Sequence, residues 1–302
     1  MLRRAAVPYR GPFSLNVGQA INPNLADVAE ILAACGRDVV LPAFRNLAGV
    51  EIGLKGPNDF VTDADIASER YLTERLLKVL PGAAVVGEET ATEEPVWRDI
   101  LGTADQVWLI DPIDGTANFA AGIRLFGILV ALVQKGVTTH AWVYDPISEE
   151  MAVAERGGGA WLAGSRVTVA AARPVAQMQG SLNLRFADKA HAPELFAAIG
   201  QIAPTLELRC AVQIYLNLAA GRSDFTLFHK MYPWDHAAGV LLHAEAGGYA
   251  RHIDGSAYSP SGPAWGNPIL LAPTQEAWMS LQSLLFAKTP SRRPGGATFG
   301  RS

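Results

Sequence analysis

The chain has 302 residues, of which 49% are hydrophobic and 18% are charged, and this apolar content excludes a disordered protein. The formal net charge of −4 offers no basic surface for a nucleic-acid polymer, and two cysteines are too few for a disulfide framework or a Cys-rich zinc site. Because no segment has the roughly 18 uninterrupted apolar residues of a membrane span and no signal peptide is evident, we expect a soluble, cytoplasmic protein with no membrane partner.

Hydrophobic spacing predicts mainly helices in the first hundred residues. Asn22 or Asn24 can cap the first of these helices. In chain order we predict an irregular segment over 1–20, a helix over 24–44, a loop over 53–58, a helix from about 63 to 77, a strand over 84–86 and a polar connector over 90–106.

Short strands joined by short turns follow, and this pattern predicts an antiparallel meander. The predicted strands cover residues 107–110, 126–133, 139–144, 151–154, 160–162 and 166–169. A change of composition near residues 165–178 then marks a subdomain boundary.

Strands and helices alternate in the second half, which predicts a layered α/β arrangement. The predicted strands are 181–184, 205–208, 224–228, 249–253 and 269–272, and the predicted helices are 193–201, 211–220, 236–246 and 274–286. We therefore divide the chain into an irregular segment (1–20), an N-terminal α+β subdomain (21–170), a C-terminal α/β subdomain (171–288) and a disordered, Pro/Gly/Arg-rich tail (289–302).

The stretch that most strongly indicates chemistry is Ile110-Asp111-Pro112-Ile113-Asp114-Gly115-Thr116-Ala117-Asn118-Phe119. Asp111 and Asp114 appear where an apolar strand ends, and Gly115 then permits a tight turn that presents backbone amides. Carboxylate oxygens suit Mg²⁺ and turn amides suit an anion, so this strand end can hold a cation beside a phosphate. Alternatively, both Asp side chains only cap local backbone groups.

Three further acidic segments also lie at predicted ends of helices or strands. Asp65 lies in a first helical turn, where the helix dipole favours a carboxylate whatever its role. Glu88 and Glu89 end a predicted strand and could simply be solvated. Asp235 lies at a predicted helix start, where Asp is a good N-cap. Each segment alone therefore has a purely structural explanation.

Taken together, these segments resemble the inositol monophosphatase family of lithium-sensitive, Mg²⁺-dependent phosphatases. The family's acidic pair at a strand end corresponds to Gly87-Glu88-Glu89. The other matching segments are Asp59-Phe60-Val61-Thr62-Asp63-Ala64-Asp65, Trp108-Leu109-Ile110-Asp111-Pro112-Ile113-Asp114-Gly115-Thr116-Ala117-Asn118-Phe119, and Pro233-Trp234-Asp235-His236-Ala237-Ala238-Gly239 with Ala244-Glu245-Ala246-Gly247-Gly248 after it. Their order and spacing agree with the family over about residues 20–288.

The resemblance implies an alternating α-β-α-β-α sandwich, a homodimer and two to three Mg²⁺ ions, most of whose ligands lie in the N-terminal subdomain. The first Mg²⁺ is expected at Glu88, Asp111 and the carbonyl of Ile113. The second is expected at Asp111, Asp114 and Asp235, with Asp111 bridging the two ions. A third, weaker ion is expected near Glu88 through water, so Glu88 also counts as catalytic.

The resemblance also implies the catalytic and substrate-binding groups. Thr116 and Asp65 correspond to the pair that orients and activates the attacking water. The amides of Gly115 and Thr116 are expected to bind phosphate oxygens, and Asp114 and Asp235 are expected to contact the substrate as well.

The chain departs from inositol-specific members of the family in its second half. The family's Gly-Thr/Ser-Ala-Ala stretch is replaced by Arg209-Cys210-Ala211-Val212, and Phe228 stands where those members have a hydroxyl-binding Glu. The loss of that carboxylate and the gain of Arg209 and Lys230 argue against inositol 1-phosphate as the best substrate. Arg209 and Lys230 are candidate substrate-binding residues for a second anionic group, as in a bisphosphate or nucleotide; alternatively, they point to solvent or to a dimer interface.

These observations predict a Mg²⁺-dependent phosphomonoesterase that acts on a small phosphorylated metabolite through a metal-activated water, without a covalent phosphoenzyme. Inositol phosphate, histidinol phosphate, fructose 1,6-bisphosphate and 3′-phosphoadenosine 5′-phosphate are the candidate substrates. The rival hypothesis is a non-catalytic metal- or phosphate-binding protein on the same scaffold.

Overall fold

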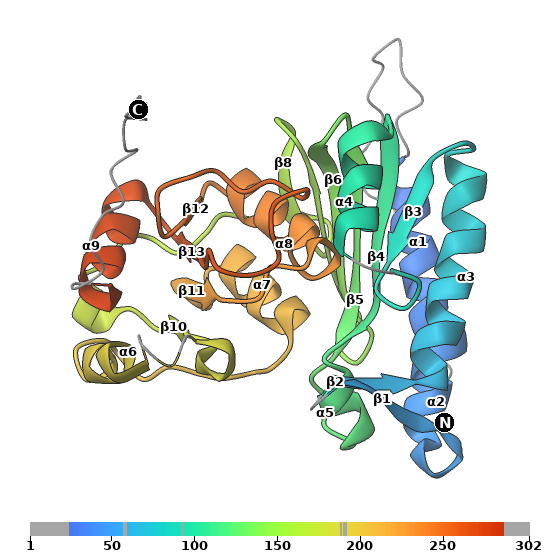
Figure 1. Cartoon of the computed structure of the whole chain (residues 1–302), viewed down its shortest axis with the longest axis horizontal. Helices are drawn as coiled ribbons and strands as arrows, with labels where there is room; N and C mark the ends of the chain where they lie inside the picture. Colours follow the sequence, from blue (N-terminus) through green and yellow to red (C-terminus); the bar gives the residue numbers. More distant parts are fainter. Residues whose placement is uncertain (1–23, 57–58, 92–93, 188, 190–191, 287–302) are drawn as a thin grey trace, which may run out of the picture.

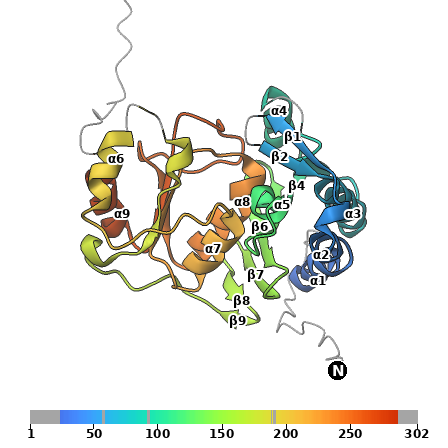
Figure 2. The ribbon, with the colours of Figure 1, turned by 90° about the horizontal axis from the view of Figure 1, so that it is seen from below.

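Five layers of helices and sheets alternate across the molecule in the computed structural model, which describes residues 24–56, 59–91, 94–187, 189 and 192–286 (Figure 1). A seven-stranded sheet lies between two helical layers, and a four-stranded sheet lies beyond the second of them. The helices of the three helical layers are α1 (Leu25–Cys35) with α3 (Asp63–Val79), then α7 (Ala211–Ala219) with α8 (Pro233–Glu245), then α6 (Ala192–Ile199) with α9 (Gln275–Leu285). The view from below shows the first and last of these layers at opposite ends of the molecule (Figure 2).

The large sheet has the strand order β3-β4-β5-β6-β7-β8-β9, and only its first pair is parallel. Its strands are β3 (Ala84–Gly87), β4 (Gln106–Asp114), β5 (Gly127–Gln134), β6 (Val137–Asp145), β7 (Glu150–Glu155), β8 (Gly159–Leu162) and β9 (Ser165–Arg166). The antiparallel pairs from β4 onward confirm the predicted meander.

Both faces of the large sheet are buried, because a helical layer covers each of them. Alternate side chains of a strand point to opposite faces and therefore enter different cores. In β4, Trp108 and Ile110 pack with α1 and α3, whereas Val107 and Leu109 pack with α7 and α8. This burial explains why the central strands are apolar runs without a polar face.

The small sheet has the order β10-β11-β13-β12, with strands β10 (Gly180–Ser181), β11 (Phe225–Phe228), β13 (Ile269–Ala272) and β12 (Tyr249–His252). A separate apolar core joins one of its faces to α6 and α9, and includes Leu195, Leu270 and Leu281. The division of the chain at residues 170 and 171 stays a prediction. Residues 1–20 and 289–302, predicted to be irregular and disordered, lie outside the described residues.

The predicted helix over 24–44 is confirmed as a continuous helical run made of α1, a π-helical turn over 36–40 and α2 (Leu41–Arg45), and Asn24 caps α1 as expected, with its Oδ1 3.0 Å from the amide of Ala26. Other local predictions are wrong. The predicted connector contains α4 (Glu94–Thr103), because Trp97 and Leu101, one helical turn apart, are both buried. In the predicted loop over 53–58, the described part belongs to β1 (Ile52–Gly56), which pairs with β2 (Asp59–Thr62). Residues 205–208 form no strand.

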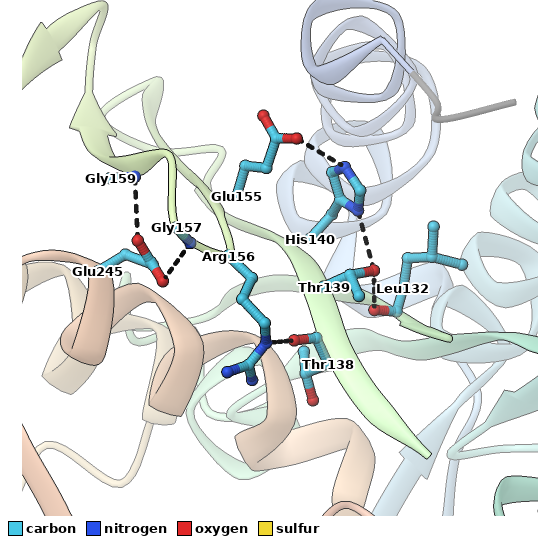
Figure 3. Close-up of polar contacts among 9 residues, drawn as sticks. All are labelled: Leu132, Thr138, Thr139, His140, Glu155, Arg156, Gly157, Gly159 and Glu245. Carbon is cyan, nitrogen blue, oxygen red and sulfur yellow. Dashed lines mark hydrogen bonds and ion pairs between the residues drawn. The ribbon is translucent and has the colours of Figure 1, made fainter. Parts of the chain in front are cut away.

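A carboxylate from α8 fastens the glycine turn between β7 and β8 (Figure 3). The two oxygens of Glu245 accept hydrogen bonds from the amides of Gly157 and Gly159 at 2.8 and 3.0 Å. This contact ties α8 to the large sheet and gives Glu245 a structural role in its motif. None of the helices in the described ranges combines the length and apolarity that a membrane span requires.

Candidate functional site

Four acidic side chains line one cavity of about 390 Å³: Glu88, Asp111, Asp114 and Asp235. Glu88 directly follows β3, and Asp111 and Asp114 belong to β4. Asp235 lies in the first turn of α8, two residues after the helix begins at Pro233. The cavity therefore lies where strand ends of the large sheet meet the start of a helix from the next layer.

A bulge in β4 places Asp111 and Asp114 on the same side of the sheet. Residues three positions apart would face opposite sides of a regular strand. Asp111 pairs with Leu129 and Asp114 with Gly127, so β4 contains one more residue than β5 between these pairs. The extra residue restores a common side for both carboxylates. Pro112, which lacks an amide hydrogen, lies within this irregular segment.

Glu88, Asp111 and Asp235 form a group that we call the acidic triad. One oxygen from each carboxylate lies within 4.8 Å of the others. The parallel register pairs Gly87 with Ile110, so the residues that follow them, Glu88 and Asp111, also lie next to each other. Charges of the same sign at this spacing repel one another unless protons or cations neutralise them.

The burial of Asp111 makes the acidic triad suitable for a cation. Its side chain is only 1% exposed, and Oδ1 has no hydrogen-bond partner among the described residues. Burial, followed by the charges of Glu88, Asp114 and Asp235, raises the Asp111 pKa well above its usual value. The three carboxylates, including that of Asp111 with its buried, unpartnered Oδ1, match the preference of Mg²⁺ for hard oxygen ligands, so the residues present fit the expected metal.

Asp114 lies in the same cavity but outside the acidic triad. Its Oδ2 accepts hydrogen bonds from the amide of Val212 at 2.7 Å and from the Cys210 thiol at 2.9 Å. Asp114 thus connects β4 to the start of α7, where the helix dipole favours a carboxylate. Burial raises the Asp114 pKa, and these hydrogen bonds oppose that shift.

The expected pair Asp65 and Thr116 is brought into contact. Thr116 Oγ1 lies 3.2 Å from Asp65 Oδ1 and 3.0 Å from the carbonyl of Ile113. Asp65 also accepts hydrogen bonds from the amide and hydroxyl of Thr62, which form a capping box at the start of α3. Asp65 is therefore held on one side by its own helix and faces Thr116 on the other.

The turn at Gly115 requires glycine for two reasons. Its φ of +85° lies in the left-handed region. A Cβ atom there would also lie 2.8 Å from the carbonyl oxygen of Leu125. The turn leads directly into α5 (Thr116–Ala120), and both Gly115 and Thr116 line the cavity.

Glu69 was not predicted, yet it holds the segment that carries Glu88. Its carboxylate is buried and accepts hydrogen bonds from the amides of Glu89 and Thr90 at 2.7 and 3.0 Å. A Cβ on Gly87 would lie 2.3 Å from this carboxylate, so glycine is needed there. The position of Glu69, one helical turn after Asp65, was the available sequence signal.

Glu69→Gln should destabilise the protein by about 2 kcal/mol. The glutamine NH₂ group would replace one of the two carboxylate oxygens, so one of the two backbone amides would lose its hydrogen-bond acceptor. We also expect weaker Mg²⁺ binding, since the turn that positions Glu88 would loosen. Urea unfolding and titration calorimetry with Mg²⁺ would measure both effects. Glu74→Gln, at an exposed position of the same helix, is the matched control, and equal behaviour of the two variants would contradict the assigned role.

Arg209 and Lys230 both line the cavity, and their role in substrate binding stays a prediction. Phe228 also lines the cavity and packs against Tyr215 and His236, at ring distances of 5.3 and 4.6 Å. The lining includes three residues that the sequence did not indicate: Arg185, Phe186 and Trp265. Arg185 and Phe186 belong to a short 3₁₀ helix (Leu184–Phe186) and Trp265 to an irregular segment, and the tertiary fold brings both to the cavity.

Known proteins resemble this chain over most of its length. A model described as the inositol monophosphatase family matches residues 22–289. An inositol-1-monophosphatase of Rhizobium meliloti is 36% identical over 217 residues, which are 70% of this chain and 79% of that protein. The Nus factor SuhB of Escherichia coli (strain K12) is 35% identical over 235 residues, covering 76% of this chain and 86% of that protein.

A solved structure agrees with the fold. The extragenic suppressor protein suhB from Bartonella henselae aligns with a TM-score of 0.75 at 25% identity, over 86% of this chain and 97% of that chain. This match confirms the alternating α-β-α-β-α sandwich.

Proposed function

Because the chain belongs to the inositol monophosphatase family, we propose that it is a Mg²⁺-dependent phosphomonoesterase that hydrolyses a small phosphorylated metabolite. The observation that carries this proposal is the acidic triad around the buried Oδ1 of Asp111. Such an arrangement is costly without cations, and it lies in a cavity large enough for a small substrate.

We assign the metal-binding role to Glu88, Asp111, Asp235, Asp114 and the carbonyl of Ile113, for two to three Mg²⁺ ions. Bound Mg²⁺ supplies positive charge for the phosphate oxygens and favours ionisation of the attacking water. Asp114 would need to share its carboxylate between the metal and the start of α7, where Val212 and Cys210 donate to Oδ2.

The chain's own residues orient the reactants. The Thr116 hydroxyl has one proton, which it can donate either to Asp65 or to the Ile113 carbonyl. Donation to Asp65 leaves the hydroxyl oxygen able to accept a hydrogen bond from the attacking water. Asp65 fixes that arrangement because its second oxygen is held by Thr62. The amides of Gly115 and Thr116 are proposed to bind phosphate oxygens, where charge develops as the bond to the leaving group breaks.

The substrate, the oligomeric state and the compartment remain predictions. Candidate substrates are inositol phosphate, histidinol phosphate, fructose 1,6-bisphosphate and 3′-phosphoadenosine 5′-phosphate; the homodimer and the cytoplasmic location are unchanged expectations. The name Nus factor SuhB belongs to several relatives, so the expected lack of a nucleic-acid partner also stays a prediction.

The direct test of activity is phosphate release from the four candidate substrates by the purified chain, in Mg²⁺ and in EDTA. We expect release from at least one substrate in Mg²⁺ and none in EDTA. Folded protein that binds Mg²⁺ but releases no phosphate would favour the non-catalytic metal-binding hypothesis.

Mg²⁺ should also raise the melting temperature, independently of turnover. A cation that binds only the folded state at 100 times its Kd stabilises that state by about 2.7 kcal/mol, which corresponds to roughly 4–5 °C for a chain of this size. Differential scanning fluorimetry would measure the shift. Potassium chloride at equal ionic strength is the control, and an equal shift in that salt would argue against a specific site.

A further inference from the structure

We propose that the leaving group of the substrate carries a second anionic group, which binds Lys230 and Arg209. This inference rests on the proposed phosphatase function, because it concerns the same cavity. The relevant part of the lining, which we call the cationic wall, consists of Arg185, Arg209, Lys230, Phe186, Tyr232 and Trp265.

Aromatic rings support two of the three cations in the cationic wall. The Lys230 ammonium lies 4.4 Å from the centre of the Tyr232 ring and 5.7 Å from that of Phe186. The Arg185 guanidinium lies 4.9 Å from the centre of the Phe186 ring. The rings of Phe186 and Tyr232 therefore lie within cation–π distance of these cations.

The acidic and the basic side chains of the cavity differ in how their charges are compensated. Once Mg²⁺ neutralises the acidic triad, the cationic wall is left with excess positive charge. Glu207 is close enough to Arg209 and Arg185 for both to lower its pKa against the larger, opposing effect of burial. Neither Lys230 nor Arg209 forms an ion pair with a carboxylate in the described part of the chain. Ammonium and guanidinium groups only donate hydrogen bonds, which suits a phosphate or carboxylate better than a neutral polyol.

Residues of the metal-binding motifs hold the backbone of the cationic wall. The Asn118 amide nitrogen lies 3.0 and 3.3 Å from the carbonyls of Leu208 and Arg209. His236 Nε2 lies 2.7 Å from the carbonyl of Lys230, so this nitrogen carries the proton. Asn118 follows Asp114 by four residues, and His236 directly follows Asp235. The segments that carry the acidic side chains therefore also hold the backbone of the cationic wall.

His236 is fixed from both sides. Its Nδ1 lies 3.0 Å from the Tyr215 hydroxyl, which donates because the proton of the ring is on Nε2. The backbone of Lys230 is thus held in place before a ligand arrives, which lowers the entropic cost of binding.

The test compares substrates that differ only in the second anion. The pairs are adenosine 3′-phosphate with adenosine 3′,5′-bisphosphate, and inositol 1-phosphate with inositol 1,4-bisphosphate. We expect kcat/KM to be at least about tenfold higher for one bisphosphate than for its monophosphate, as one or two charge-assisted hydrogen bonds would give. Lys230→Gln and Arg209→Gln should each reduce that ratio several-fold. Phosphorus NMR of the product would show that the second phosphate is retained.

Lys78→Gln is the matched control, because this exposed lysine lies about 20 Å along α3 from Asp65. It should leave the ratio unchanged. Equal kcat/KM for both members of each pair, or equal losses on both in Lys230→Gln, would overturn the inference and leave the phosphatase function intact. If no compound is hydrolysed, the function itself is in doubt, and calorimetry in Ca²⁺ still decides the inference: equal Kd values for bisphosphate and monophosphate would refute it.

Discussion

Asp111→Asn should reduce kcat/KM by about three orders of magnitude or more while leaving the protein folded. The substitution keeps the size of the side chain but removes the central charge of the acidic triad. It can also turn an amide NH₂ towards the position that a cation must occupy. A loss of this size corresponds to about 4 kcal/mol of transition-state stabilisation. Initial rates of phosphate release and circular dichroism would measure activity and folding.

Although the same variant should lose activity, it should be more stable than the unchanged protein when no metal is present. In EDTA, we expect Asp111→Asn to melt at a higher temperature than the unchanged protein, because a neutral side chain relieves the burial and repulsion that raise the Asp111 pKa. In Mg²⁺, the metal-dependent rise in melting temperature should be largely lost.

Asp63→Asn is the matched control for Asp111→Asn. Asp63 is exposed and lies two residues before Asp65 in the same acidic motif. It should retain both turnover and the Mg²⁺-dependent shift in melting temperature. Undiminished turnover in Asp111→Asn would rule out the assignment of this residue as the central metal ligand.

The sequence singles out the three residues of the acidic triad individually because each belongs to a short, local motif, whereas the resemblance to the family groups them at one site. Glu88, Asp111 and Asp235 each lie within a few residues of a glycine or proline that ends a strand or starts a helix. Local backbone preferences of this kind are visible without the fold. The same holds for Asp65, whose capping box with Thr62 is formed within four residues.

Features that depend on packing were not predictable in the same way. The helix α4 was missed because its polar composition concealed the buried pair Trp97 and Leu101. The contact of Asp114 with α7 joins residues that are 98 positions apart, and no local pattern indicates it. Phe186 and Trp265 likewise meet only in the folded chain, with ring centres 6.0 Å apart. The residues of the acidic triad therefore come from local motifs, whereas the rest of the cavity lining is brought together by tertiary packing.

Thr116→Val should lower kcat by about 10²–10⁴-fold, the range expected when a group that positions a transferred proton is removed. Valine has nearly the shape of threonine but cannot donate to Asp65 Oδ1, which lies 3.2 Å from the hydroxyl. Thr116→Ser keeps the hydroxyl and should retain most of the activity. Steady-state kinetics of the two variants, on whichever substrate is hydrolysed, would separate the hydroxyl from the shape of the side chain.

The Mg²⁺-dependent rise in melting temperature distinguishes Thr116→Val from Asp111→Asn. Thr116 Oγ1 contacts Asp65 and the Ile113 carbonyl, and it is not part of the acidic triad. Thr116→Val should therefore lose turnover but keep the rise, whereas Asp111→Asn should lose both. If Thr116→Val also lost the rise, the hydroxyl would act mainly by holding the metal-binding strand end. If it kept full turnover, the water-orienting role of Thr116 and Asp65 would be wrong, and the acidic triad alone would have to supply the chemistry.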